Sequence, residues 1–385
     1  MQQTNDSPVQ APAIGRRELL AGAAGIAGSL AGASLLGLNP AHAVPVAAGV
    51  TKFGLPAGDH VRILVTGDAG TGTRTQWAVA DTAREYHARE PFSMAVGLGD
   101  NIYDSGPDDD HDAQFATKFE TPNAGLDFPW AMALGNHDTS AIFPGDGGWL
   151  ERGNFEVAYH AKSPRWWMPS RYYSLRAPQT DPVVELFVLD LTPLAALIPP
   201  LLSPYWNIDG EYMNAQREWL DRALAESTAE WKVVCTHFPY LSNGSHGNAG
   251  SYDGLPAPLN GAPAKRFYED HVLGKVNLLL AGHDHSLQVL EPTIATKGAR
   301  QIVSGAAAKT SGAKGSGSAG LGSSGSGSLG GGSGSSGGSK TKALYESHDR
   351  LGFMVLDLTP AMANLRVVTV DPATGTGTEV FDRRL

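Results

Sequence analysis

Five short motifs, each directly after an apolar run, carry the side chains that could do chemistry. They are Gly67-Asp68-Ala69-Gly70, Gly99-Asp100-Asn101-Ile102-Tyr103, Gly135-Asn136-His137-Asp138, Thr236-His237 and Gly282-His283-Asp284-His285. The candidate metal ligands in them are carboxylates, a phenol, an amide and imidazoles: Asp68, Asp100, Tyr103, Asn136, His237, His283 and His285. This mixture of oxygen and nitrogen ligands suits iron, zinc or manganese and does not suit calcium.

The number of candidate ligands indicates two ions. Seven ligands exceed the need of one ion, and they suffice for two if one carboxylate bridges. Two ions about 3.5 to 4 Å apart make a clamp for in-line displacement at phosphorus. Each motif alone is a weak signal, because Gly-Asp after a strand is usually a turn and a lone His-x-His is more often a strand pair or a capped turn. Five such motifs at five strand ends make coincidence improbable.

The elements that must position these motifs are short apolar strands alternating with helices. Strands are predicted at 61–66, 92–98, 129–134, 183–191, 231–236 and 276–281, and helices at 75–88 and 214–227. This alternation predicts an α/β sandwich with largely parallel strands in its first part. Because the carboxyl ends of parallel strands collect at one edge of a sheet, the motifs are expected to meet in one crevice.

Composition limits the partners. The chain has 385 residues, 42% of them hydrophobic, and a formal net charge of −10. This acidic balance argues against a nucleic-acid or anionic-membrane partner. The only cysteine is Cys235, which excludes an intramolecular disulfide and a cysteine-rich zinc site.

Residues 1–43 are predicted to be an export signal. Arg16 and Arg17 precede a long apolar stretch, and the small residues Ala-His-Ala at 41–43 suit a signal peptidase. The paired arginines predict export by the twin-arginine machinery and a periplasmic or secreted protein. The alternative is a membrane anchor, but the Gly and Ala content makes the stretch weakly hydrophobic, so no stable membrane anchor is expected.

A second unusual segment, 311–339, is nearly all Gly, Ser and Ala. The segment has too little apolar surface to offset the conformational entropy that its chain would lose on ordering. This composition predicts a flexible surface loop. A domain linker is the alternative, but residues 340–385 have the pattern of strands that complete a sheet begun earlier. Residues 44–385 are therefore expected to form one domain with this loop inserted.

The five motifs, in this order, resemble the signature of the metallophosphoesterases and, within them, the purple acid phosphatases. Tyr103 discriminates between branches, because Gly-Asp-Asn-Ile-Tyr matches the iron-tyrosinate branch and not the protein Ser/Thr phosphatases. The likeness is greatest to the small, tartrate-resistant type. It extends through 159–176, 282–290, 302–306 and the closing Glu-Val-Phe-Asp-Arg-Arg-Leu. It implies a single-domain β-sandwich of two mixed sheets flanked by helices.

The resemblance also implies a dinuclear centre. A ferric ion would be held by Asp68, Tyr103, His285 and the bridging Asp100, and a divalent iron, zinc or manganese ion by Asp100, Asn136, His237 and His283. The implied function is an acid phosphatase, in which a metal-bound hydroxide attacks a small phosphomonoester. A trivalent ion lowers the pKa of bound water, so that hydroxide persists at acidic pH.

Two histidines are candidates to protonate the leaving alcohol. His137 follows a candidate ligand and is expected to pair with Asp138, which would fix its tautomer and raise its pKa. His246 stands where the resembling phosphatases place a histidine near the substrate. From the residues alone, His246 has the pattern of a solvated loop residue in a Gly, Ser and Asn stretch.

Substrate preference stays open. The apolar, proline-rich segment 193–210 could form a hydrophobic wall, a partner surface or a lid. A phosphodiesterase or broad-specificity phosphoesterase on the same site is the alternative among enzymes. A non-enzymatic binding or adhesion module with a relic site is disfavoured, because no ligand position is missing from the motifs.

Overall fold

In the computed structural model, which describes residues 53–311 and 340–385, the apolar runs of the sequence form strands. The export signal expected at 1–43 lies outside the described residues, as does the loop expected at 311–339 apart from its first residue. All described residues fall in one structural unit. Within these ranges, no helix is both long enough and apolar enough to cross a membrane.

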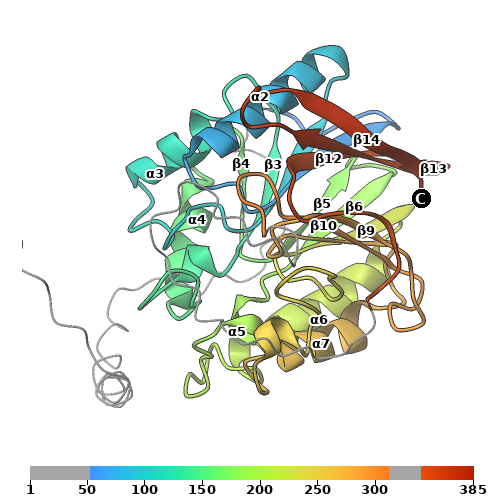
Figure 1. The fold of residues 1–385 in the computed structure, drawn as a ribbon. Coiled ribbons are helices and arrows are strands. Elements are labelled where there is room, and N and C mark those ends of the chain that lie inside the picture. The colour runs from blue at the N-terminus through green and yellow to red at the C-terminus, as the bar shows by residue number, and fades with distance from the viewer. Residues whose placement is uncertain (1–52, 312–339) are drawn as a thin grey trace, which may run out of the picture. The chain divides into compact units, whose positions relative to one another are not determined.

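The strands assemble into two mixed sheets of seven strands each (Figure 1). The first has the order β14-β13-β12-β1-β2-β3-β4 and the second β11-β9-β10-β8-β7-β6-β5. The strands of the first sheet are β1 (Val61–Thr66), β2 (Met94–Leu98), β3 (Trp130–Ala133), β4 (Trp166–Trp167), β12 (Leu351–Thr359), β13 (Met362–Val370) and β14 (Gly377–Arg384). Those of the second are β5 (Tyr173–Ala177), β6 (Val184–Val188), β7 (Trp231–Cys235), β8 (Leu278–Ala281), β9 (Leu287–Leu290), β10 (Arg300–Ser304) and β11 (Ala343–Ser347).

Both sheets contribute fully buried side chains to one hydrophobic core. Ile63 and Met354 of the first sheet and Leu280 and Ile302 of the second belong to the same cluster. Burying apolar side chains from both faces stabilises the sandwich, at roughly 25 cal/mol for each Å² removed from water. The predicted α/β sandwich of two mixed sheets is confirmed.

Helices cover the outer faces of the sandwich. They are α2 (Arg74–Arg89), α3 (Ala113–Phe115), α4 (Gly153–Tyr159), α5 (Thr192–Ala195), α6 (Glu211–Glu226) and α7 (Ala262–Phe267). In α6, Met213, Leu220 and Leu224 are buried in a second cluster with Phe187 and Val234 of the second sheet. This spacing places the three residues on one face of the helix. The apolar face predicted for 214–227 is therefore the face that packs on the second sheet.

The strands after the Gly- and Ser-rich segment complete both sheets, as expected for residues 340–385. β12 pairs antiparallel with β1, and β11 pairs antiparallel with β9. The central strands are parallel: β1, β2 and β3 in the first sheet, and β6, β7, β8 and β10 in the second.

The sequence predicted that the motifs meet at one edge of a single sheet, but in the structure they come from two sheets. Three motifs follow strands of the first sheet, and two follow strands of the second. The two groups meet because the loops after β1 and β8 touch: a Cβ built on Gly67 would lie 3.3 Å from Cα of Gly282. The site therefore lies where the carboxyl ends of two sheets meet.

Candidate metal centre

The structure brings all seven predicted ligands into one cluster, in which only Asn136 and His285 are partly exposed. Asp68 follows β1, Asp100 and Tyr103 follow β2, and Asn136 follows β3. From the other sheet, His237 follows β7 and His283 and His285 follow β8. One ligand atom from each of Asp68, Asp100 and His237 lies within 4.8 Å of the others.

Local backbone geometry turns these side chains inward. Asp68, Asp100 and His283 have φ values of 58°, 53° and 68°, in the left-handed region that non-glycine residues seldom adopt. Such conformations cost free energy and cluster at functional sites. The glycines of two motifs allow close approach, because a Cβ on Gly135 or Gly282 would lie 2.2 Å or 2.5 Å from a carboxylate oxygen of Asp100 or Asp68.

The ligand atoms separate into two groups. In the first, the hydroxyl of Tyr103 donates to Oδ1 of Asp68 at 3.1 Å and lies 3.1 Å from Nε2 of His285. Nε2 of His285 lies 3.5 Å from the same oxygen of Asp68. A phenol, a carboxylate and an imidazole thus face one point.

The second group contains an amide and two imidazoles. Nε2 of His237 lies 2.9 Å from Oδ1 of Asn136 and 3.2 Å from Nδ1 of His283. Nδ1 of His237 donates to the carbonyl of Leu98 at 2.8 Å, which leaves the lone pair of Nε2 facing the cluster.

Asp100 lies between the two groups. Its Oδ1 is 3.5 Å from Nε2 of His237, and its side chain also hydrogen-bonds Tyr103 of the first group. The N–H of His137 donates to Oδ1 at 3.0 Å and orients the carboxylate. This is the position that a bridging ligand must occupy.

The electrostatics of the metal-free site favour a cation. Burial raises the pKa of Asp68 to about 8, with repulsion from Asp100 adding to the effect. Burial lowers the pKa of His285 to about 4 and that of His283 well below its usual range. Neutral imidazole is the form that binds metal, and a bound cation would restore the charge of the carboxylate. The donor set and its protonation states therefore fit metal ions.

Comparison with known proteins decides the family. The profile of the calcineurin-like phosphoesterases matches residues 61–287, the span that contains all five motifs. The chain belongs to this family. Among phosphoesterase relatives, rat tartrate-resistant acid phosphatase type 5 is 30% identical over 218 residues, 55% of this chain and 59% of the relative.

Other curated relatives agree. The mouse tartrate-resistant acid phosphatase type 5 is 30% identical over 270 residues, covering 63% of this chain and 75% of the relative. Purple acid phosphatase 3 of Arabidopsis thaliana is 31% identical over 237 residues, covering 59% of this chain and 58% of the relative. The resemblance to purple acid phosphatases is confirmed. The chain spans about three fifths of the length of the first curated relatives it matches.

A solved structure supports the fold. That of GAP50, the anchor in the inner membrane complex of Plasmodium, superposes with a TM-score of 0.58. It is 17% identical, and the match covers 85% of this chain and 89% of the other. At this identity the likeness bears on the phosphoesterase fold alone.

The expected pairing of His137 with Asp138 is wrong. Nδ1 of His137 donates instead to the carbonyl of Asp104 at 2.6 Å, and burial lowers the pKa of the imidazole where a rise was expected. The buried carboxylate of Asp138 accepts the N–H groups of Ile102 (2.9 Å) and Gly135 (2.8 Å). These bonds join the loops after β2 and β3, so Asp138 positions the loops that carry the candidate ligands rather than a histidine.

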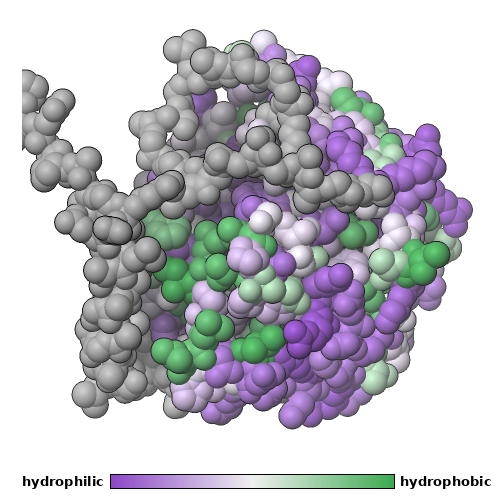
Figure 2. All heavy atoms as spheres, turned by 60° about the horizontal axis from the view of Figure 1, so that its bottom comes forward, coloured by the Kyte–Doolittle hydropathy of each residue, from purple (hydrophilic) through white to green (hydrophobic). Residues whose placement is uncertain are grey.

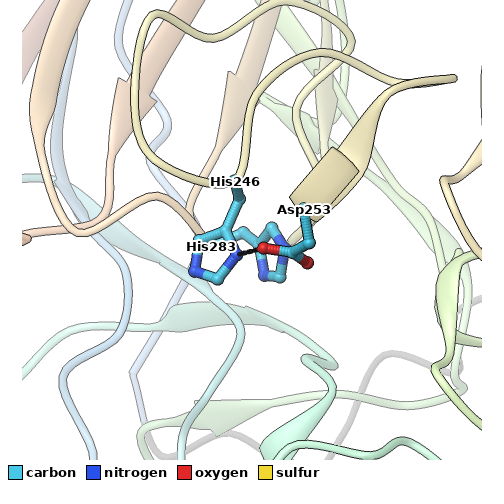
Figure 3. A group of neighbouring side chains, drawn as sticks. All are labelled: His246, Asp253 and His283. Carbon is cyan, nitrogen blue, oxygen red and sulfur yellow. Dashed lines mark hydrogen bonds and ion pairs between the residues drawn. The ribbon is translucent and has the colours of Figure 1, made fainter. Parts of the chain in front are cut away.

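His246 lies beside the ligands, as expected (Figure 3). Its ring centroid is 4.2 Å from that of His283, and Nδ1 donates to Oδ1 of Asp253 at 2.8 Å. The N–H of Asp253 donates to the carbonyl of His246 at 2.9 Å, which closes a double link between the two residues. Burial by itself would lower the pKa of His246, but the hydrogen bond to Asp253 and the charge of Asp284 raise it to about 9.

Two neighbours of the candidate metal centre could not be predicted from the sequence. One is Asp253, which holds His246 and follows a Gly- and Ser-rich loop without any motif. The other is Lys309, whose Nζ lies 3.4 Å from the centroid of the Tyr103 ring. No spacing pattern marks Lys309, but it follows the Ile-Val-Ser-Gly-Ala stretch that carried part of the family resemblance.

The metal-free protein is predicted to lose stability as the pH rises from 6.5 to 8. In this range an unfolded Asp68 has already lost its proton and an unfolded His246 is losing its own, whereas the folded protein keeps that of His246 and loses that of Asp68 only toward pH 8. The lowered pKa values of His283 and His285 act in the opposite direction, but only in the lower part of the range, where the unfolded imidazoles still bind protons. Since the folded state binds more protons, the free energy of unfolding falls by about 1.4 kcal/mol per pH unit for each excess proton. Urea unfolding of chelator-treated protein at the two pH values measures the change.

A matched pair of variants assigns this effect. Asp68→Asn removes a titrating carboxyl and should flatten the pH dependence, whereas exposed Asp181→Asn should leave it unchanged. A metal-free protein that is more stable at pH 8 than at pH 6.5 would contradict the electrostatic account.

Proposed function

We propose that this protein is an exported acid phosphatase that hydrolyses small phosphomonoesters at a dinuclear centre of Fe(III) and a divalent iron, zinc or manganese ion. The observation that carries the proposal is the division of the seven ligands into two groups with Asp100 between them. The curated relatives named as tartrate-resistant and purple acid phosphatases support it.

The two ligand groups suit different ions. Asp68, Tyr103 and His285, which include the phenol, are suited to hold the ferric ion. Asn136, His237 and His283 are suited to hold the divalent ion, with Asp100 shared by both. When bound, the two ions supply a water of lowered pKa and neutralise charge that develops on the phosphoryl oxygens.

The two candidate histidines have different protonation states. The raised pKa of His246 keeps its imidazole charged near neutral pH, and its hydrogen bond to Asp253 directs Nε2 away from that carboxylate. His246 can therefore donate a proton to the departing alcohol oxygen. Burial keeps His137 neutral and its Nδ1–H is used by Asp104, so His137 offers only an accepting Nε2 to a bound substrate or water. This difference assigns the acid role to His246.

Export is part of the proposal on sequence grounds. Arg16, Arg17, the apolar stretch and Ala-His-Ala at 41–43 support twin-arginine transport, cleavage after Ala43 and a periplasmic or secreted product. N-terminal sequencing of the exported protein tests this, and a product that retains Arg16 and Arg17 would contradict it.

Tyr103→Phe is predicted to abolish the visible colour of the metal-loaded protein. The variant removes the phenol oxygen that would transfer charge to Fe(III), while the buried ring keeps its place in the core. Metal analysis, the visible spectrum and circular dichroism measure the three quantities together.

The control for this experiment is Tyr159→Phe. The Tyr159 hydroxyl donates to Glu120 (3.1 Å), away from the ligands. This variant should keep the colour. A metal-loaded parent without a visible band, or a band that survives Tyr103→Phe, would overturn the iron assignment.

Asp253→Asn is predicted to slow esters with poor leaving groups selectively. Without the carboxylate, His246 loses the partner that orients and charges it, so kcat for an alkyl phosphate should fall by about 10²-fold. kcat for p-nitrophenyl phosphate, whose leaving group needs little protonation, should change by less than about fivefold. Steady-state kinetics with both substrates measure the difference.

The matched control is Asp181→Asn. Asp181 has nearly the same backbone φ as Asp253, 52° against 54°, but it lies exposed before β6, at the end of the sheet away from the ligands. Equal losses for both esters in Asp253→Asn would show that Asp253 acts on folding or metal binding and not through His246.

A further inference from the structure

Two loops beside the metal ligands expose large apolar side chains, which we call the apolar rim. Its members come from the loop before α4 and from the segment after α5, and they are 37% to 90% exposed: Ile142, Phe143, Trp149, Leu197, Leu201 and Leu202. In Figure 2 the lower part of Figure 1, where α5 lies, is turned to the front. Hydrophobic side chains are gathered on this face. Exposed apolar surface gathered in this way commonly marks a binding site.

The first loop of the rim is held rigidly. The fully buried carboxylate of Asp146 accepts the N–H groups of Ala141 (2.7 Å), Ile142 (2.7 Å), Phe143 (3.0 Å) and Gly148 (3.0 Å). Moving the backbone at Ile142 and Phe143 would break hydrogen bonds to a fully buried carboxyl group, which is costly. The fold therefore fixes the backbone from which these two exposed side chains project.

The second loop is joined to the first and anchored below. The N–H of Ile198 donates to the carbonyl of Asp146 at 3.1 Å. Farther along, the indole of Trp206 donates to Glu151 (2.8 Å) and lies under the guanidinium of buried Arg171, 4.8 Å from the ring centroid. The apolar rim is thus preformed, which lowers the entropy cost of binding.

The rim begins at the metal ligands. The side-chain amide of Asn136 donates to the carbonyl of Gly145 at 2.9 Å, and a Cβ on Gly145 would lie 2.8 Å from Nε2 of His137. Phe143 is two residues from Gly145, so their Cα atoms are at most about 7 Å apart. A phosphoryl group at the ligands would therefore have Phe143 within reach of the chain attached to it.

We infer that the apolar rim binds the hydrocarbon part of the substrate, so that the site prefers phosphomonoesters of apolar alcohols. This inference rests on the proposed phosphomonoesterase function and names its substrate class. Five of the six rim side chains carry no hydrogen-bonding atom, and the sixth, Trp149, has only its indole N–H, so the rim offers a sugar or polyol almost no polar partners. The net charge of −10 disfavours an anionic bilayer as the occupant of the rim.

A chain-length series of n-alkyl phosphates, propyl to heptyl, tests the inference, because leaving-group basicity stays nearly constant along it. Full burial would improve kcat/KM by about fourfold per methylene. A one-sided rim should give about half of this free energy, which is about twofold per methylene and roughly fifteenfold from propyl to heptyl. Calorimetric Kd values for propyl- and heptylphosphonate should show the same ratio without turnover.

The variants act on one loop each. Ile142→Ser with Phe143→Ser should reduce the heptyl-to-propyl ratio to below about threefold. Leu201→Ser with Leu202→Ser should lower the ratio as well. The control is Ile294→Ser, whose side chain is 99% exposed in the loop after β9, at the far end of the strand that follows His285. It should keep the parent ratio.

Each contrary outcome has its own meaning. A parent that hydrolyses propyl phosphate but shows a heptyl-to-propyl ratio near one overturns the inference and leaves the proposed function standing. A heptyl-to-propyl ratio that is unchanged in the rim variants also overturns the inference. If these variants in addition dissociate an oligomer in sedimentation, the rim is a contact between copies of the chain instead. A metal-loaded parent that hydrolyses no phosphomonoester overturns both proposals.

Discussion

The polar metal-ligand side chains gathered where the two sheets meet are the constraint that the rest of the structure accommodates. The side chains of Asp68, Asp100 and His237 are almost completely buried next to the apolar core. Burial there removes most of the water that would otherwise hydrate them. Backbone N–H groups and the Leu98 carbonyl orient them but do not neutralise them. Two cations would provide the positive charge that compensates these buried side chains and that the protein alone lacks. Folding of the loops and metal binding should therefore be coupled.

The fold and the ligands could be predicted because both leave local signals. Strands buried on both faces are continuous apolar runs, and β1 occupies the predicted residues 61–66. The run at 183–191 is a strand only to Val188, because the chain then turns to pair buried Asp190 with Arg171 at 2.8 Å. The ligands follow such runs directly, which is why their positions could be inferred without any knowledge of the strand order.

Side chains that act through tertiary contacts could not be predicted in this way. Proximity in sequence suggested that His137 pairs with Asp138, but the buried carboxylate satisfies backbone N–H groups of two loops instead. Asp253 and Lys309 reach the site from loops whose sequences resemble ordinary turns. The division of the motifs between two sheets depends on strand pairing over long separations, which local patterns do not encode.

Anomalous diffraction from crystals of the metal-loaded protein tests the central claim most directly, because it locates the ions independently of any activity. Two peaks are predicted about 3.5 to 4 Å apart. One should lie against Tyr103 and the other against Asn136, with Asp100 between them. A single peak, or peaks that Asp100 does not join, would contradict the account.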